Sequence, residues 1–159
     1  MQELAANYNE LVDQIFRFVY LKTSSRETAE DLTSECFMST VKYLQTNEVQ
    51  NLRAFLYKTA RNKIIDHYRI KGRVIYSDEA VLANEGEIGY EDIVNRQDAR
   101  MVRDTLVNLE DADKEVLTLR YTEDLSVTDI AKIVGKNPVA VRVQIFRALR
   151  KMRDILNKN

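Results

Sequence analysis

Residues 53–73, RAFLYKTARNKIIDHYRIKGR, form a basic and aromatic stretch around which the rest of the chain can be arranged. The stretch holds seven Lys or Arg and a single acid, and therefore carries a net charge of +6. Its aromatic rings and the chain's only histidine are Phe55, Tyr57, His67 and Tyr68. Positive charge follows phosphates, and aromatic faces accept unstacked bases, so this mixture favours nucleic acid, especially separated strands.

Helical spacing within the stretch separates a packing side from a free side. The packing side is formed by Leu56, Ala60 and Ile64, flanked by Tyr57 and Tyr68. The other side carries Lys58, Asn62 and Arg69 beside Phe55 and Ile65. An ordinary solvated amphipathic helix has the same pattern, and this stretch alone does not separate the two interpretations.

Composition predicts an all-α fold for the 159 residues, because there is one proline and there are only four glycines. No apolar run approaches the roughly 18 residues of a membrane span, and no signal peptide opens the chain. A single cysteine, Cys36, excludes an internal disulfide, and one cysteine with one histidine cannot form a structural zinc site. We expect no metal and no cofactor, and a reducing, cytoplasmic location.

The net charge of −1 conceals a segregation of charge along the chain. Residues 132–158 carry eight cations and one acid, a second basic block of +7. Between the two basic blocks, residues 77–98 hold seven acids and one base. Two nucleic-acid contact surfaces, separated by a connector that like charge keeps off DNA, explain this order.

The chain before the basic stretch predicts two helices, over residues 3–22 and 26–44, with a cap at Thr23, Ser24 and Ser25. The polar loop 45–51 follows. Core positions at helical spacing are Leu4, Leu11, Ile15, Phe18 and Val19 in the first helix and Leu32, Phe37, Val41 and Leu44 in the second. We therefore expect a helical domain over residues 1–73, a flexible acidic linker over 74–95 and a second helical domain over 96–159.

The second domain predicts helices over residues 96–109 and 111–121, the latter with Val116, Leu117, Leu119 and Tyr121 inward. Ser126 and Asp129 form a plausible capping box for a short helix over 127–134. Gly135 ends that helix, and Pro138 suits the first turn of the next one. This order is typical of a helix-turn-helix, although an αα-hairpin within a core shares its small-residue spacing.

On the second helix of this motif we expect one side to be buried and the opposite side to face DNA. The buried stripe is Val141, Ile145, Ala148, Leu149 and Met152. The side predicted to project away from it is Ala140, Gln144, Arg147 and Lys151, with Arg142 and Arg150 flanking. Its first outward residues would reach base edges in the major groove, and its later cations would reach phosphates.

Two motifs in the first domain, AEDLTSECF at 29–37 and RAFLYKTARNKIIDHYR at 53–69, resemble region 2 of bacterial sigma factors of the extracytoplasmic-function (ECF) group. Ser34 stands where that family often has Gln. The resemblance implies binding to the β′ clamp of core RNA polymerase through Asp31, Leu32, Glu35 and Phe37. It also implies a −10 promoter surface at Arg53, Lys58, Arg61, Asn62, Lys63, His67, Arg69 and Lys71, and a flipped-base loop with Gln45, Thr46, Asn47 and Asn51.

Two further motifs, LEDADKEVLTLRY at 109–121 and LSVTDIAKIVGKNPVAVRVQIFRA at 125–148, resemble region 4 of the same family. That implies a −35 surface at Lys136, Asn137, Ala140, Arg142, Gln144, Arg147 and Lys151, and a contact with the polymerase β flap. Gln144 and Ala140 replace a frequent Arg and a frequent Thr. Because Gln reads adenine and Arg reads guanine, we expect a shifted −35 preference.

Three other functions fit parts of the sequence. A stand-alone helix-turn-helix regulator would act without polymerase, but a second basic and aromatic helix is unusual in that class. His67 could serve an enzyme as a general base, yet no phosphate loop, HExxH or nucleophile elbow accompanies it. A protein-binding scaffold would leave the paired cationic helices without a purpose. We therefore expect an alternative sigma factor, not an enzyme, with promoter DNA and core polymerase as partners and an anti-sigma factor as a further candidate partner.

Overall fold

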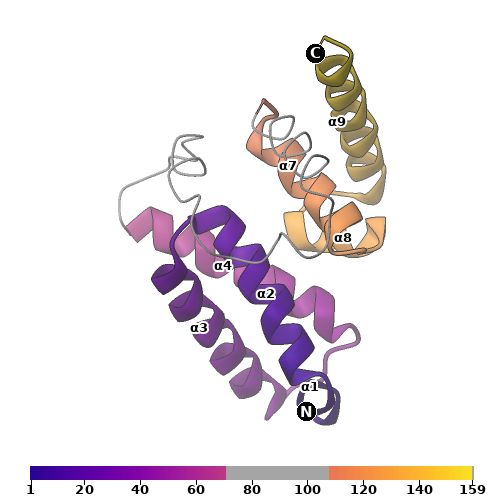
Figure 1. Ribbon diagram of the computed structural model, residues 1–159. Coiled ribbons are helices and arrows are strands. Elements are labelled where there is room, and N and C mark those ends of the chain that lie inside the picture. The colour runs from indigo at the N-terminus through magenta and orange to yellow at the C-terminus, as the bar shows by residue number, and fades with distance from the viewer. Residues whose placement is uncertain (71–107, 159) are drawn as a thin grey trace. The chain divides into compact units, whose positions relative to one another are not determined.

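The computed structural model describes residues 1–70 and 108–158, and their regular secondary structure is entirely helical. These residues form two compact units, one that includes residues 1–70 and one that includes residues 108–131 and 135–158 (Figure 1). The all-α, two-domain expectation is confirmed. The expected linker lies outside the described residues, as does the predicted helix over 96–109 except for its last two residues.

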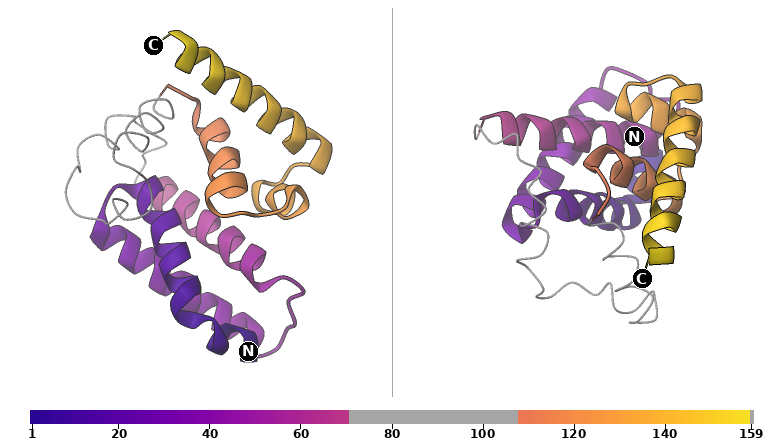
Figure 2. Two further views of the ribbon diagram at one scale, coloured as in Figure 1. Left: turned by 45° about the vertical axis from the view of Figure 1, so that its right-hand side comes forward. Right: turned by 90° about the horizontal axis from the view of Figure 1, so that it is seen from above.

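The first unit is a bundle of three long helices, preceded by one short helix (Figures 1 and 2). Its elements are α1 (Gln2–Ala6), α2 (Tyr8–Thr23), α3 (Arg26–Leu44) and α4 (Leu52–Ile70). The prediction of a single helix over residues 3–22 is wrong, because the helix is interrupted at Asn7, whose backbone has φ −113° and ψ 16°. The Asn7 side chain donates to the carbonyl of Glu3 at 3.1 Å, and such a local bond competes with the helix ladder.

The α2–α3 turn forms as its three polar residues predict. Ser24 takes the left-handed conformation, with φ 53°, and ends α2. Ser25 begins α3, where its hydroxyl accepts a hydrogen bond from the amide of Thr28 at 3.3 Å. Ser24 thus ends one helix and Ser25 begins the next, so the chain reverses direction and the two long helices can pack antiparallel.

The core of the first unit lies where α2, α3 and α4 meet. Side chains that are at most 1% exposed there include Ile15, Phe18, Val19, Ala29, Cys36, Thr40, Leu56, Tyr57, Ala60 and Ile64. The ring of Tyr57 meets that of Phe18 edge-on, with 5.2 Å between centroids. Tyr57 is therefore a packing residue, as its predicted place beside the packing side of this helix indicates.

The second unit contains α7 (Asp111–Leu117), the π-helical turn η2 (Thr118–Thr122), α8 (Val127–Val134) and α9 (Pro138–Lys158). The prediction that Tyr121 points inward is wrong, because its side chain is 61% exposed. Leu119 is buried as expected. A π-helical turn holds more residues than an α-helical one, so η2 rotates Tyr121 out of the inward register that continues through α7.

The turn between α8 and α9 has the geometry that its sequence predicts. The hydroxyl of Ser126 accepts from the amide of Asp129 at 3.1 Å and so caps α8. Gly135 ends α8 in the left-handed conformation, with φ 73°. Its amide and that of Lys136 both donate to the carbonyl of Ala131 at 3.0 Å. A residue with a Cβ would be strained at Gly135.

Helix α9 starts with a cap that the sequence analysis did not assign. The side-chain oxygen of Asn137 accepts a hydrogen bond from the amide of Ala140 at 2.8 Å, directly before Pro138. Val141 on α9 and Ile130 on α8 are both fully buried. The helix-turn-helix prediction is therefore confirmed.

Candidate nucleic-acid interface

The exposed side of α4 carries a polar and basic stripe. Lys58, Asn62 and Arg69 are all exposed and recur at three- and four-residue spacing, with Ile65 37% exposed between them. The guanidinium of Arg69 lies 3.0 Å from the carboxylate of Asp66 one turn earlier. Because both partners of this pair are more than half exposed, it is a weak restraint that phosphate contact could replace. We call Lys58, Asn62, Ile65 and Arg69 the α4 face.

Arg53 does not belong to the α4 face, although it was expected at the −10 element. It is half-buried, and its Nε donates to the side-chain oxygen of Gln14 on α2 at 3.0 Å. Its guanidinium also lies 5.7 Å from the centroid of the Tyr57 ring. These contacts make Arg53 a link between α4 and α2.

The remaining expected −10 residues lie beside the α4 face or beyond the described chain. Arg61, Lys63 and His67 are half-buried, and Lys71 lies outside the described residues. The His67 ring meets Tyr68 edge-on at 5.3 Å. The Tyr68 hydroxyl donates to the carbonyl of Lys22 at 3.1 Å, and burial raises the pKa of this phenol. The end of α4 is thus attached to the end of α2 by a neutral, donating tyrosine.

The loop between α3 and α4 is held by its own asparagines. The amide nitrogen of Asn47 donates to the carbonyl of Tyr43 at 3.0 Å and to the Thr46 hydroxyl at 2.9 Å. The side-chain oxygen of Asn51 accepts from the amide of Ala54 at 3.0 Å and caps α4. Gln45, like the three loop residues Thr46, Asn47 and Asn51, is exposed. All four expected flipped-base residues therefore lie at the surface, and two of them also shape the loop.

An aromatic pair, which the sequence analysis missed, spans this loop. Tyr43 near the end of α3 lies against Phe55 in the first turn of α4, with ring centroids 4.9 Å apart and an interplanar angle of 30°. Tyr43 is 43% exposed. In the sequence, Tyr43 could have been singled out because it lies close to a polar loop that precedes a basic helix. Sequence spacing alone, however, does not show that its ring contacts that of Phe55.

The four expected clamp-binding residues on α3 are of two kinds, exposed acids and buried apolar residues. Asp31 and Glu35 are exposed one turn apart. Leu32 and Phe37 are each only 5% exposed, and Phe37 meets the Tyr8 ring edge-on at 5.4 Å. The acids can therefore touch a partner directly, whereas the two apolar residues hold α3 in place.

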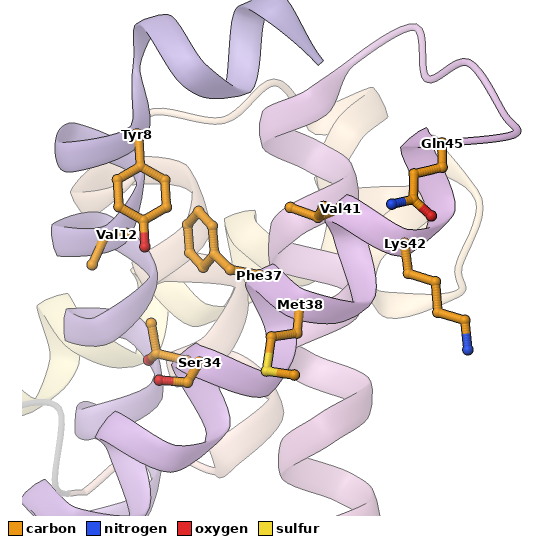
Figure 3. Close-up of a pocket in the computed structure, with 9 residues that line it drawn as sticks. Tyr8, Val12, Ser34, Phe37, Met38, Val41, Lys42 and Gln45 are labelled. Atoms are coloured by element: carbon orange, nitrogen blue, oxygen red, sulfur yellow. The ribbon is translucent and has the colours of Figure 1, made fainter.

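A groove of about 680 Å³ lies between α2 and α3 (Figure 3). Tyr8 and Val12 line it from α2, and Phe37 and Met38 line it from α3. Met38 is 71% exposed. The hydroxyl of Thr33, which also lines the groove, is buried and has no hydrogen-bond partner among the described residues. The groove therefore offers mainly apolar surface, and its exposed part includes Met38.

Two residues on the side of α9 that was predicted to face DNA have a contact with α7. Gln144 and Lys151 were predicted to project away from the buried stripe, but both contact Asp113 on α7. The Lys151 ammonium lies 2.8 Å from one Asp113 oxygen, and the Gln144 amide donates to the other at 3.4 Å. Leu149, predicted to be buried, is 40% exposed. Val141, Ile145 and Ala148 are buried as expected, so most of the predicted stripe is confirmed, and Gln144 and Lys151 are held beside it by Asp113.

The exposed side of α9 mixes arginines with apolar residues. Val139, Val143 and Phe146 are 66%, 42% and 64% exposed at three- and four-residue spacing. Arg142, Arg147 and Arg150 are exposed around them. We call these six residues the α9 face. The sequence analysis missed the three apolar members, although valine methyls and aromatic rings can contact the methyl group of thymine.

The other expected −35 residues lie around the start of α9. Asn137 caps the helix, and Ala140 is half-buried in its first turn. Lys136 is exposed, and its ammonium donates to the side-chain oxygen of Gln144 at 2.9 Å. Only Arg142 and Arg147 of the seven expected residues therefore lie on the α9 face.

Two other kinds of site were considered for the part of the chain that the structure describes, a metal centre and a membrane span. No group of three His, Cys, Asp or Glu side chains there could hold a metal ion. None of its helices has the length and apolar character needed to cross a bilayer.

Two family models match separate parts of the chain. The model described as Sigma-70 region 2 matches residues 8–74, which contain α2, α3 and α4. The model described as Sigma-70, region 4, matches residues 99–152, which contain α7, α8 and most of α9. The two matches thus include the α4 face and the α9 face.

Individual proteins similar to this chain are sigma factors of the ECF group. The ECF RNA polymerase sigma factor BldN of Streptomyces coelicolor is 31% identical over 154 residues, which are 94% of this chain and 58% of BldN. SigM of Bacillus subtilis, also an ECF sigma factor, is 24% identical over 95% of this chain and 93% of its own. SigW of the same organism is 29% identical over 90% and 85%.

Solved structures share the fold. The sigma factor RpoE of Bartonella quintana, crystallised with the anti-sigma factor NepR, matches with a TM-score of 0.76 and 20% identity over 99% of this chain and 98% of that one. CnrH, in complex with the cytosolic domain of CnrY, matches with a TM-score of 0.65 and 21% identity over 99% and 87%. With both family regions present in order and ECF relatives along nearly its whole length, the chain belongs to the sigma-70 family, in its ECF group.

Proposed function

We propose that this protein is an alternative sigma factor that binds core RNA polymerase and directs it to promoters, where it recognises the −35 element and opens the −10 element. The observation that carries the proposal is the pair of exposed faces, one on each helical unit. Lys58, Asn62 and Arg69 form the polar part of the first, and Arg142 and Arg147 lie on the second. One duplex can be contacted at two places only if both surfaces are exposed, and these five side chains are exposed.

The α4 face serves strand opening in this proposal. Its cations contact phosphates of the −10 element, while the loop 45–51 receives an unstacked base. Extrusion of a base costs a few kcal/mol, and stacking on an aromatic ring returns about 1–3 kcal/mol. Tyr43 and Phe55, 4.9 Å apart across the loop, provide the aromatic surface. Arg53 contributes by holding α4 against α2.

The α9 face serves duplex recognition. Helix α9 is the second helix of the helix-turn-helix, and such a helix lies in the major groove. Arg142 and Arg147 can donate to guanine or to phosphate, and Val143 and Phe146 can contact thymine methyl groups. The expected domain boundaries, 1–73, 74–95 and 96–159, place one function in each domain and the acidic connector between them.

Polymerase binding is assigned to the outer side of α3. Asp31 and Glu35 present charge, and the adjoining groove presents apolar surface at Met38. A contact of the second domain with the β flap completes the attachment.

We also propose regulation by an anti-sigma factor, by analogy with similar proteins of known structure. RpoE and CnrH were each solved with a partner protein, named as the anti-sigma factor NepR and the cytosolic domain of CnrY. We place this chain in the cytoplasm with its polymerase and give it no catalytic step of its own.

Reconstitution with core polymerase tests the proposal. Purified protein is mixed with core enzyme, and association is measured by gel filtration and promoter-dependent initiation by run-off transcription. We expect a complex that starts at defined sites, and core enzyme alone that does not. Specific binding to promoter duplex without polymerase would favour a stand-alone regulator instead.

A further inference from the structure

Asp113 is one of the few buried charged residues in the described chain. It lies in the first turn of α7, and only 6% of its surface is exposed. Burial of a carboxylate is costly unless it is paired and hydrogen-bonded. Both of its oxygens meet this need through α9, one by the Lys151 ammonium at 2.8 Å and the other by the Gln144 amide at 3.4 Å.

These two partners bind the carboxylate from successive parts of one helix. Gln144 and Lys151 are seven residues apart, which is about two turns, so they lie on the same side of α9. A contact at one turn restrains the distance between two helices, whereas contacts two turns apart also restrain the rotation and tilt of one helix on the other. Asp113 therefore fixes how α9 lies on α7.

The same network occupies the polar groups of Gln144. Its amide nitrogen donates to Asp113 at 3.4 Å, and its oxygen accepts from the Lys136 ammonium at 2.9 Å. A carboxylate only accepts and an ammonium only donates, so this orientation of the amide satisfies both neighbours. Bidentate recognition of adenine requires the same two groups of a glutamine. The two contacts use one N–H and one oxygen lone pair of Gln144, and together they hold its amide in one orientation.

Lys151 is similarly engaged. Its ammonium is paired with a buried carboxylate, and the hydrogen bond and the charge of Asp113 raise its pKa. Lys151 therefore stays charged at neutral pH while its charge is directed towards α7.

We infer that Asp113 is a positioning residue for −35 recognition: by holding Gln144 and Lys151 against α7, it sets the orientation in which α9 presents Arg142, Val143 and Phe146 to DNA. This inference rests on the proposed function, since it concerns how an assigned promoter surface is oriented. It replaces the expectation that Gln144 reads the −35 element directly.

The test compares −35 discrimination by reconstituted holoenzyme. Run-off transcription is measured on one promoter and on versions with single base changes in the −35 element, for wild type, Asp113→Ala, Gln144→Ala and Arg142→Ala. The readout is the ratio of initiation between the original and changed elements, which a general loss of folded protein does not alter. We expect Asp113→Ala to lower this ratio by about fivefold, a typical coupling within one contact network.

Gln144→Ala should leave the identity of the preferred bases unchanged, whereas Arg142→Ala should change it. Asp113→Asn, which has the same shape but no charge, should fall between wild type and Asp113→Ala. Adding Gln144→Ala to Asp113→Ala should have little further effect, because the contact is already lost. Melting curves identify a temperature at which every variant is folded, and all assays are run there.

Two results would overturn the inference. One is a change of base preference by Gln144→Ala as large as that by Arg142→Ala. The other is an unchanged discrimination ratio in folded Asp113→Ala. Failure of the proposed function is distinguishable from both, because wild-type protein would then direct no promoter-dependent initiation at all.

Discussion

Arg53 donates from Nε to the side-chain oxygen of Gln14 at 3.0 Å and so joins the first turn of α4 to the middle of α2. A hydrogen bond to a charged group contributes about 1.5–3 kcal/mol, and loss of one partner leaves the other unsatisfied. We predict that Arg53→Ala lowers the free energy of unfolding by about 1–3 kcal/mol. Chemical denaturation of the purified protein measures this change.

Lys58→Ala is the matched control, since it also removes one cation from α4 but at an exposed position. Surface substitutions usually change stability by no more than about 0.5 kcal/mol. Lys58→Ala should therefore leave unfolding unchanged and weaken −10 opening. If Arg53→Ala weakened opening without loss of stability, Arg53 would belong to the DNA surface after all.

Tyr43 supplies a second prediction, about the aromatic pair across the loop. Tyr43→Ala should reduce strand opening on duplex promoters by about 1–3 kcal/mol, the range for stacking one base on an aromatic ring. Permanganate reactivity of thymines in the −10 element reports the opening. Tyr43→Phe keeps the ring and should behave like wild type. Equal losses for Ala and Phe would show that the hydroxyl acts and that stacking is not the cause.

Asn137 supplies a third prediction, about the start of the recognition helix. Its side-chain oxygen caps α9 at 2.8 Å from the Ala140 nitrogen, so Asn137→Ala should cost about 1 kcal/mol of stability. Asn137→Ser retains a capping oxygen and should cost much less. Thermal unfolding measures both variants. A change of −35 base preference in Asn137→Ser, with stability retained, would instead indicate direct reading by the asparagine.

Cys36 supplies a prediction about pH. Burial raises the pKa of its thiol from 9.0 to about 12, only partly offset by Lys63 and Thr40. Because the folded pKa lies above the unfolded one, the stability from this group is fully present below pH 9 and is lost as pH rises towards 12. The unfolding free energy of wild type should fall more steeply over that range than that of Cys36→Ala. Equal slopes would contradict the assigned pKa.

The buried thiol should also be inert in native protein. The thiolate is the reactive form, and at pH 8 a thiol with a pKa of about 12 forms almost none. A thiol reagent should therefore label Cys36 at pH 8 only after denaturant is added.

Sequence reasoning predicted features that depend on local chemistry. Ser25, Ser126 and Gly135 act as the helix signals that their types and spacing indicate. The buried stripe of α4 was also predicted, because Leu56, Ala60 and Ile64 repeat at helical spacing. Each of these features depends on residues within a few positions of one another.

Features that are not determined by local residue types were not predicted. The inward prediction for Tyr121 failed because η2 changes the register, and nothing in the local residue types announces a π-helical turn. The contact that holds Gln144 against α7 depends on Asp113, which lies 31 positions earlier in the chain. The sequence does not distinguish Arg53 from the other cations of its stretch, because its partner, Gln14, lies on another helix.

The most direct test of the account is run-off transcription from a promoter library randomised at both elements, with wild type and two surface variants in complex with core polymerase. One variant carries Lys58→Ala, Asn62→Ala and Arg69→Ala on the α4 face, and the other carries Arg142→Ala and Arg147→Ala on the α9 face. We predict that both still bind core enzyme, that the first loses selectivity at the −10 element only, and that the second loses it at the −35 element only. Loss of core binding by either variant, or selectivity unchanged at both elements, would contradict the assignment of one promoter element to each helical unit.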